Sequence, residues 1–244
     1  MKYIKLFENF EPHDPYELMI IPPNKKTEMI IEEIKKREPN LNLISDLIVL
    51  GADLEWQDEY GQTVLHFATV RGLVEIAKML IDAGADVNIQ DTFQKTVLHY
   101  SVSQNLPKIV RMLIDAGADL NLQDNSGKTA LYFCAFINNP KIAKMLIKAG
   151  ADLNIQDQHG ETALYISAYK GNIEILRMLI DAGADLNVQD EDGMTALYWC
   201  AYKNYLEVSK LLIDAGADKT IPDNRGKLPY EIGNSPEIKK LLQP

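Results

Sequence analysis

Long apolar runs are missing from this 244-residue sequence. No stretch approaches the roughly 20 consecutive apolar residues that a membrane-spanning helix needs. The first ten residues, MKYIKLFENF, are interrupted by Glu8 and lack the apolar core of a secretory signal. We therefore expect neither a transmembrane helix nor a signal peptide.

Positive charge is also scarce. The chain has 25 Lys and Arg against 35 Asp and Glu, a formal net charge of −10. Nonspecific binding to nucleic acid requires cations that neutralise phosphates, and docking to anionic lipid makes a similar demand. The composition argues against nucleic acid and against a membrane surface as partners.

Cysteine and histidine are few and scattered. Two Cys and four His form no cluster with metal-ligand spacing. The sequence also has no glycine loop for phosphates and no nucleophile elbow. We predict no enzymatic activity, no metal site and no cofactor.

The main positive feature is an internal repeat. The tripeptide Gly-Ala-Asp occurs six times at intervals of 33 residues, starting at Gly51, Gly84, Gly117, Gly150, Gly183 and Gly216. A fixed period of this length is typical of a solenoid, in which each unit contacts only its neighbours. The function of such an array depends on what binds its long surface.

One unit, residues 58–90, contains signals for a turn and two helices. Asp58 and Gly61 have the spacing favoured in a type I turn. Thr63 follows as an N-cap, so we expect a short helix over residues 64–71. The apolar spacing then predicts a second helix over residues 74–83.

The repeated motifs are TVLH at 63–66 and 96–99, and TALY at 129–132, 162–165 and 195–198. With the 33-residue period, they resemble the ankyrin repeat family. The resemblance implies an all-α fold, a solenoid of stacked helix-turn-helix units joined by β-hairpin-like turns. It divides the chain into a non-repeat N-terminal arm (1–24), a degenerate capping repeat (25–57), five full repeats (58–90, 91–123, 124–156, 157–189 and 190–222) and a truncated C-terminal cap (223–244).

Several positions depart from the family pattern or recur with structural meaning. Gln94 stands where the turn glycine is expected, so we expect a distorted turn in the second repeat. Tyr132, Tyr165 and Tyr198 replace the motif histidine seen at His66 and His99, and we interpret them as links between repeats. The turn aspartates recur once per repeat, which indicates scaffolding rather than acid–base chemistry.

The two cysteines occupy the same position two repeats apart. Stacked helices lie about 8–10 Å apart, so two repeats separate Cys134 from Cys200 by about 20 Å. A disulfide requires Cα atoms within about 7 Å. We expect free, buried thiols in a reducing compartment and predict a cytoplasmic protein.

By resemblance, a partner protein docks on a concave face formed by the turn tips and the first helices. The first helices are rich in aromatic residues, which recur at three repeat positions, or columns. The motif tyrosines form the first column. The second column, which forms either core or the floor of the groove, is Phe67, Tyr100, Phe133, Ile166 and Trp199, and the third, one helical turn further on, is Val70, Ser103, Phe136, Tyr169 and Tyr202. Lys170 and Lys203 beside these rings would suit an acidic residue on the partner. The candidate partner-binding residues are Tyr60, Phe67, Phe93, Tyr100, Phe133, Phe136, Ile137, Tyr169, Lys170, Trp199, Tyr202 and Lys203.

Alternatives to this reading remain open. The rings of the third column could pack against the turn tips or against residues 1–24 instead of binding a partner. The array could be a regulatory or inhibitory subunit that blocks an enzyme, or a structural protein that assembles with itself. For the free protein we predict a monomer.

Overall fold

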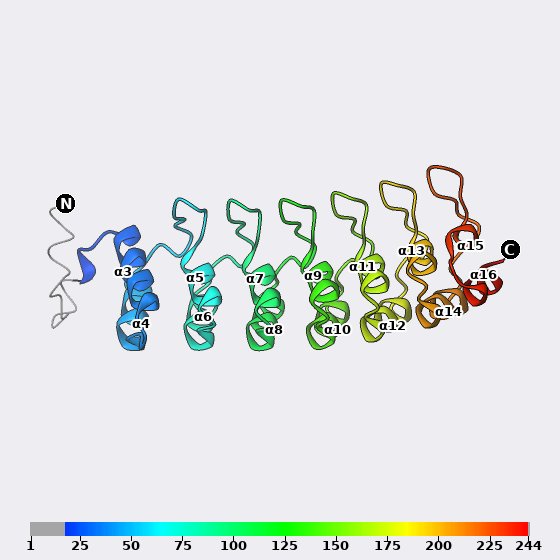
Figure 1. Ribbon diagram of the computed structural model, residues 1–244. Helices are drawn as coiled ribbons and strands as arrows, with labels where there is room; N and C mark the ends of the chain where they lie inside the picture. The colour runs from blue at the N-terminus through cyan, green and yellow to red at the C-terminus, as the bar shows by residue number, and fades with distance from the viewer. Residues whose placement is uncertain (1–17, 244) are drawn as a thin grey trace.

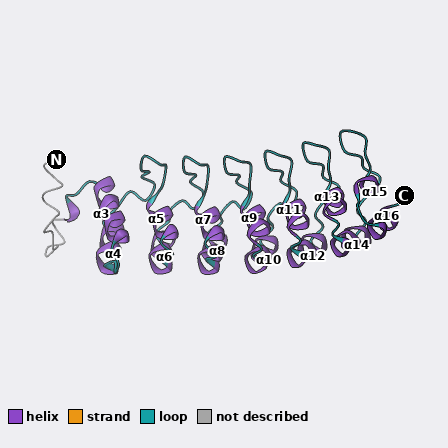
Figure 2. Cartoon of the chain, viewed as in Figure 1, coloured by secondary structure: helices purple, strands orange, loops and turns teal. Residues whose placement is uncertain are grey.

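The structure is a computed structural model that describes residues 18–243. This part of the chain contains fourteen helices, α3 to α16, and no β-strand (Figure 2). The predicted all-α solenoid is confirmed. Residues 1–17, most of the predicted N-terminal arm, lie outside the described residues.

The five full repeats each contribute two antiparallel helices to two parallel rows (Figure 1). The first helices are α5 (Val64–Val70), α7 (Val97–Ser103), α9 (Ala130–Ile137), α11 (Ala163–Lys170) and α13 (Ala196–Lys203). The second helices are α6 (Val74–Asp82), α8 (Pro107–Asp115), α10 (Pro140–Lys148), α12 (Ile173–Asp181) and α14 (Leu206–Asp214). Each helix packs on its equivalent in the next repeat, and loops project along one side of the array.

Threonine side chains begin the first helices, as predicted. Thr129 Oγ1 accepts a hydrogen bond from the amide of Tyr132 at 3.2 Å. A residue with positive φ follows α9, α11 and α13: Asn138 at 56°, Gly171 at 71° and Asn204 at 62°. Glycine and asparagine tolerate this left-handed conformation, so these positions end the helices without strain elsewhere.

Each loop is closed by the carboxylate of its aspartate. In the second repeat, Asp91 Oδ1 accepts hydrogen bonds from the amides of Phe93 and Lys95, at 2.8 and 2.9 Å. The amide of Asp91 in turn donates to the Lys95 carbonyl. The equivalent bonds recur in the other repeats. The predicted scaffolding role of the turn aspartates is confirmed.

The expected distortion at Gln94 is wrong. Gln94 adopts φ 56°, in the same left-handed region as the turn glycines, and its amide donates to the Asp91 carbonyl at 2.8 Å. Neighbouring tips hold the loop on both sides, because Thr92 donates to the Tyr60 carbonyl and Asn125 donates to the Phe93 carbonyl. The neighbouring repeats thus impose the turn geometry on a residue that does not favour it.

Helix pairs cover both ends of the array: α3 (Pro23–Lys35) with α4 (Leu41–Val49), and α15 (Pro229–Ile232) with α16 (Pro236–Leu242). The N-terminal pair buries Ile30, Ile34 and Leu47 completely. The guanidinium of Arg71 donates to the carbonyl of Lys35 at 3.0 Å and so ties the cap to the first full repeat.

The core runs without a break through all the repeats. Its central members are the leucines of the TVLH and TALY motifs: Leu65, Leu98, Leu131, Leu164 and Leu197. Cys134 and Cys200 are free and fully buried in the same core. Burial raises the pKa of the Cys200 thiol to about 12, so it stays protonated at neutral pH.

Candidate functional site

The motif tyrosines tie each repeat to the next and lie beneath the surface. Their hydroxyl groups donate to a carboxylate of the following repeat: Tyr132 to Glu161 at 2.8 Å, Tyr165 to Asp190 at 2.7 Å and Tyr198 to Asp223 at 2.8 Å. The predicted linking role is confirmed. Burial and the bonded carboxylate raise the pKa of Tyr198 to about 12, which keeps its hydroxyl a donor.

The two motif histidines make an equivalent link as neutral rings. The amide of Thr63 donates to His66 Nδ1 at 3.2 Å, so the proton lies on Nε2, which donates to the Lys95 carbonyl of the next repeat. His99 makes the same bonds one repeat later. Burial lowers the pKa of both imidazoles, in keeping with the neutral tautomer.

The second column of the first helices is only half accessible. Phe67, Tyr100, Phe133 and Trp199 are half-buried and Ile166 is buried. Tyr100 donates to Asp91 Oδ2, and the indole of Trp199 donates to Asp190 Oδ2 at 3.2 Å. These side chains support the face from below more than they project from it.

The third column projects further, together with Ile137, which follows it in α9. Phe136, Ile137 and Tyr202 are 46%, 40% and 49% exposed. Tyr169 is half-buried and packs edge-on against Trp199 of the next repeat, with ring centroids 5.4 Å apart. Tyr202 packs against the other side of Trp199 at the same distance. We call these five residues, which span α9, α11 and α13, the apolar band.

Lysine side chains lie over the rings of the band. Lys170 Nζ is 4.3 Å from the ring centroid of Phe136 in the preceding repeat. Lys203 Nζ is 5.0 Å from the Tyr169 ring and 5.8 Å from the Tyr202 ring. Each ammonium is attracted by the electron-rich face of a ring. The structure thus brings together seven of the twelve predicted binding residues.

The remaining predicted residues lie apart from the band. Tyr60 and Phe93 are 56% and 57% exposed on the tips of the first two full repeats. Phe67 and Tyr100 lie in α5 and α7, towards the N-terminal end. Phe133 lies in α9, the helix of Phe136 and Ile137, but its ring centroid is 5.5 Å from Lys95 Nζ of the preceding repeat.

Two features of this face escape sequence reasoning. Lys95 and Lys128 hold positions over aromatic rings in the same manner as the predicted lysines. Asp157 Oδ2 is buried without a hydrogen-bond partner, because Tyr132 donates to Glu161 instead, and Lys128 Nζ lies 3.9 Å away. The unpaired Asp157 oxygen could have been expected from the sequence, because Glu161 stands where the next repeat has Met194.

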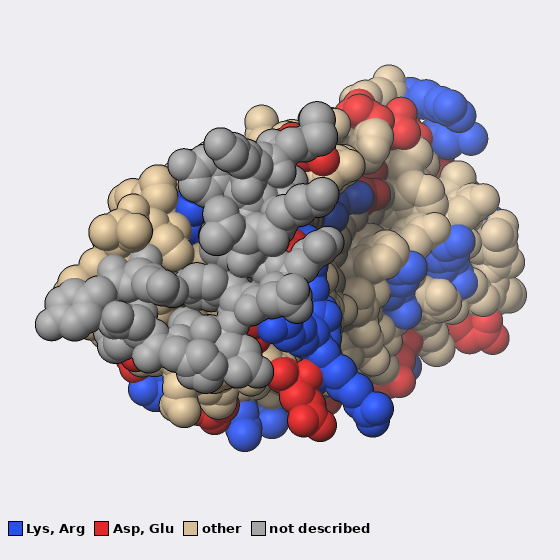
Figure 3. Space-filling view, turned by 90° about the vertical axis from the view of Figure 1, so that its left-hand side faces the viewer, with Lys and Arg blue, Asp and Glu red and all other residues tan. Residues whose placement is uncertain are grey.

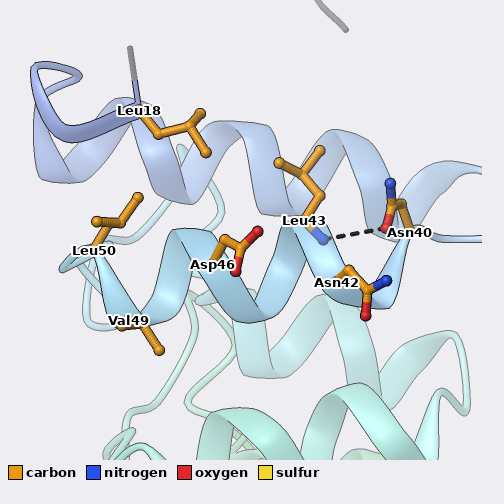
Figure 4. Close-up of a pocket in the computed structure, with 7 residues that line it drawn as sticks. All are labelled: Leu18, Asn40, Asn42, Leu43, Asp46, Val49 and Leu50. Atoms are coloured by element: carbon orange, nitrogen blue, oxygen red, sulfur yellow. Dashed lines mark hydrogen bonds between the residues drawn. The ribbon is translucent and has the colours of Figure 1, made fainter. Parts of the chain in front are cut away.

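A cavity of about 350 Å³ lies at the opposite end of the array, between α4 and Leu18 (Figure 4). Leu18, Leu43, Val49 and Leu50 supply its apolar walls. Asn40 caps α4 at its edge by accepting a hydrogen bond from the amide of Leu43. It contains none of the predicted binding residues.

Residues 18–243 contain neither a membrane-spanning helix nor a cluster of metal ligands. No helix in this range is long and apolar enough to cross a bilayer. Nor do any three His, Cys, Asp or Glu side chains in the range form a group that could hold a metal ion.

Comparison with known proteins agrees with this geometry. A family model described as "Ankyrin repeats (3 copies)" matches residues 34–124, 83–157 and 131–223. Among solved structures, the ankyrin-repeat domain of Bcl-3, described as a unique member of the IkappaB protein family, superposes with a TM-score of 0.80 at 23% identity, covering 91% of this chain and 98% of that chain. No curated protein sequence matches. The chain belongs to the ankyrin repeat family.

Proposed function

We propose that this chain is a non-catalytic interaction module that docks a partner protein on the concave face formed by its loops and first helices. The apolar band carries the proposal. Its residues come from three consecutive repeats, and three of them are at least 40% exposed. A large aromatic side chain covers about 150–250 Å², so even half-exposed rings create a patch of a few hundred Å². Patches of this size on soluble proteins are frequently binding sites.

The packing within the band favours a binding role for the exposed rings. Trp199 holds Tyr169 and Tyr202 on its two sides and is itself fixed by its bond to Asp190. Rings fixed before binding lose little conformational freedom on association. Aromatic residues are also the usual anchors of protein interfaces. We place the protein in the cytoplasm within this proposal, because Cys134 and Cys200 are unpaired thiols.

Affinity capture from a lysate of the source cells tests the proposal. The band variant is Phe136→Ala/Ile137→Ala/Tyr202→Ala, whose side chains are exposed and whose removal leaves the core intact. Tyr205→Ala is the matched control, because Tyr205 is an exposed aromatic that begins a second helix and lies outside the band. Circular dichroism first establishes that both variants are folded.

We expect the wild type and the control to retain the same protein and the band variant to lose it. Retention by all three would contradict the proposal. The same capture with Tyr60→Ala/Phe93→Ala then asks whether the turn tips bind instead. A molecular mass that rises with concentration in the wild type alone would favour self-assembly through the band.

A further inference from the structure

We infer that the partner presents an extended acidic segment to the apolar band, with carboxylates about three residues apart. This inference rests on the proposed function, because it concerns the same surface. It names the chemistry of the bound segment, which the exposed rings alone leave undefined.

The first observation is the distribution of charge. The chain carries 35 Asp and Glu and a net charge of −10, yet the five first helices contain no acidic residue. Their only charged residues are Lys170 and Lys203, and Arg71 follows α5. Figure 3 views the array from its N-terminal end and shows basic (blue) and acidic (red) side chains on the surface. The surface of the first helices is therefore more favourable to anionic groups than the rest of this acidic chain.

The second observation is how the lysines are held. Lys170 and Lys203 are exposed, and within residues 18–243 neither ammonium has a carboxylate within 4.0 Å. Lys78 on α6, by contrast, pairs with Asp82. An aromatic ring orients an ammonium without neutralising its charge. The ammonium groups of Lys170 and Lys203, which lie over the band, are thus oriented by its rings and can pair with a partner's carboxylate.

Two acids that hold the first helices together are occupied within the array. Asp190 Oδ2 accepts hydrogen bonds from both Tyr165 and Trp199, and its other oxygen accepts two turn amides. Glu161 is half-buried and accepts from Tyr132. Their hydrogen-bonding capacity is largely used, so they do not compete with a ligand for Lys170 and Lys203.

The spacing of the cations sets the form of the segment. Lys170 and Lys203 occupy the same position in adjacent repeats, and adjacent packed helices lie about 8–10 Å apart. An extended chain advances about 3.3 Å per residue, so three residues cover one repeat. A segment with an acidic side chain at every third position matches both lysines, while apolar side chains between them contact Phe136, Ile137 and Tyr202.

Single-stranded nucleic acid also combines negative charge with rings that stack on aromatic side chains. Its backbone carries a phosphate at every nucleotide, and binding requires several cations in a row. The band offers two. The observations favour the peptide.

Fluorescence anisotropy with three labelled probes tests the inference on the full chain. The probes are the peptide Glu-Phe-Ser repeated four times, the same peptide with Gln for every Glu, and a deoxythymidine oligonucleotide of equal length. We expect the Glu peptide to bind most tightly and to weaken as salt rises from about 0.05 M to 0.5 M.

Lys170→Gln/Lys203→Gln should weaken binding of the Glu peptide about tenfold, the sum of two exposed ion pairs. Lys144→Gln/Lys210→Gln is the matched control, with the same loss of charge from exposed positions on the second helices α10 and α14. It should change binding less than twofold. The band variant should lose binding of either peptide.

The outcomes separate this inference from the proposed function. Equal affinity for the Gln and Glu peptides, both lost in the band variant, overturns the acidic segment but keeps the band as a docking surface. Tighter binding of the oligonucleotide overturns the inference in favour of nucleic acid. Failure of the Glu peptide to bind at millimolar concentration overturns it as well, whereas the lysate capture decides the proposed function independently.

Discussion

Removing the hydroxyl of Tyr198 should weaken the C-terminal end of the array. Tyr198 is the side-chain donor to Asp223 Oδ2, at 2.8 Å, and Asp223 is only 6% exposed. A hydrogen bond to a charged group contributes about 1.5–3 kcal/mol, and an unpaired buried carboxylate oxygen adds a desolvation cost. We expect Tyr198→Phe to lower the free energy of unfolding by about 2 kcal/mol.

Two further substitutions of the same kind calibrate this value. Tyr165→Phe should cost about 1 kcal/mol, because Asp190 keeps the bond from Trp199 and is less buried than Asp223. Tyr202→Phe should cost less than about 0.5 kcal/mol, because Tyr202 is exposed. Urea unfolding followed by circular dichroism measures all three. Equal losses, or a loss at Tyr198 no greater than at Tyr202, would refute the assigned role of these hydroxyl groups.

Four other variants test the account of the repeats. Burial lowers the pKa of His66 and His99 in the folded protein. Because the unfolded chain therefore binds more protons, the free energy of unfolding should fall as pH drops through about 6.5. His66→Tyr/His99→Tyr should reduce that fall, measured by urea titrations at pH 7.5 and 5.5. Gln94→Gly should raise the free energy of unfolding by about 1 kcal/mol, because glycine adopts positive φ without strain. Gly160→Ala should lower it by at least as much, because the added Cβ would lie 2.8 Å from Asp190 Cα. Melting temperatures that move the other way would contradict both expectations. Glu161→Met copies the residue of the next repeat and should let the Tyr132 hydroxyl donate to the buried Asp157 carboxylate instead. We expect the free energy of unfolding to rise by about 1 kcal/mol. An unchanged urea midpoint would show that the hydroxyl does not move.

The fold could be predicted because each repeat contains its own start and stop signals. A capping threonine and a residue suited to positive φ enclose each full-length first helix, and six Gly-Ala-Asp turns end the second. The predicted distortion at Gln94 is wrong because hydrogen bonds between neighbouring tips hold its loop in the regular turn. A local rule for glycine cannot include that constraint.

The sequence predicts which repeat positions form the candidate site, but not how far each side chain is exposed. Phe136, Tyr169 and Tyr202 share one repeat position, yet Tyr169 is half-buried while the other two are exposed. Tyr169 contacts Trp199 and Lys203 of the following repeat, whereas Tyr202 contacts the same two side chains within its own helix. The placement of Lys170 over Phe136 likewise depends on side-chain rotamers, which sequence periodicity does not define.

Amide hydrogen exchange tests the central claim most directly. The full chain is measured alone and with the protein that it retains from the lysate. We predict that protection on binding concentrates in α9, α11 and α13 and in the loops that precede them. Protection confined to α10, α12 and α14, or to the capping helices α3 and α4, would contradict the claim that the apolar band is the binding surface.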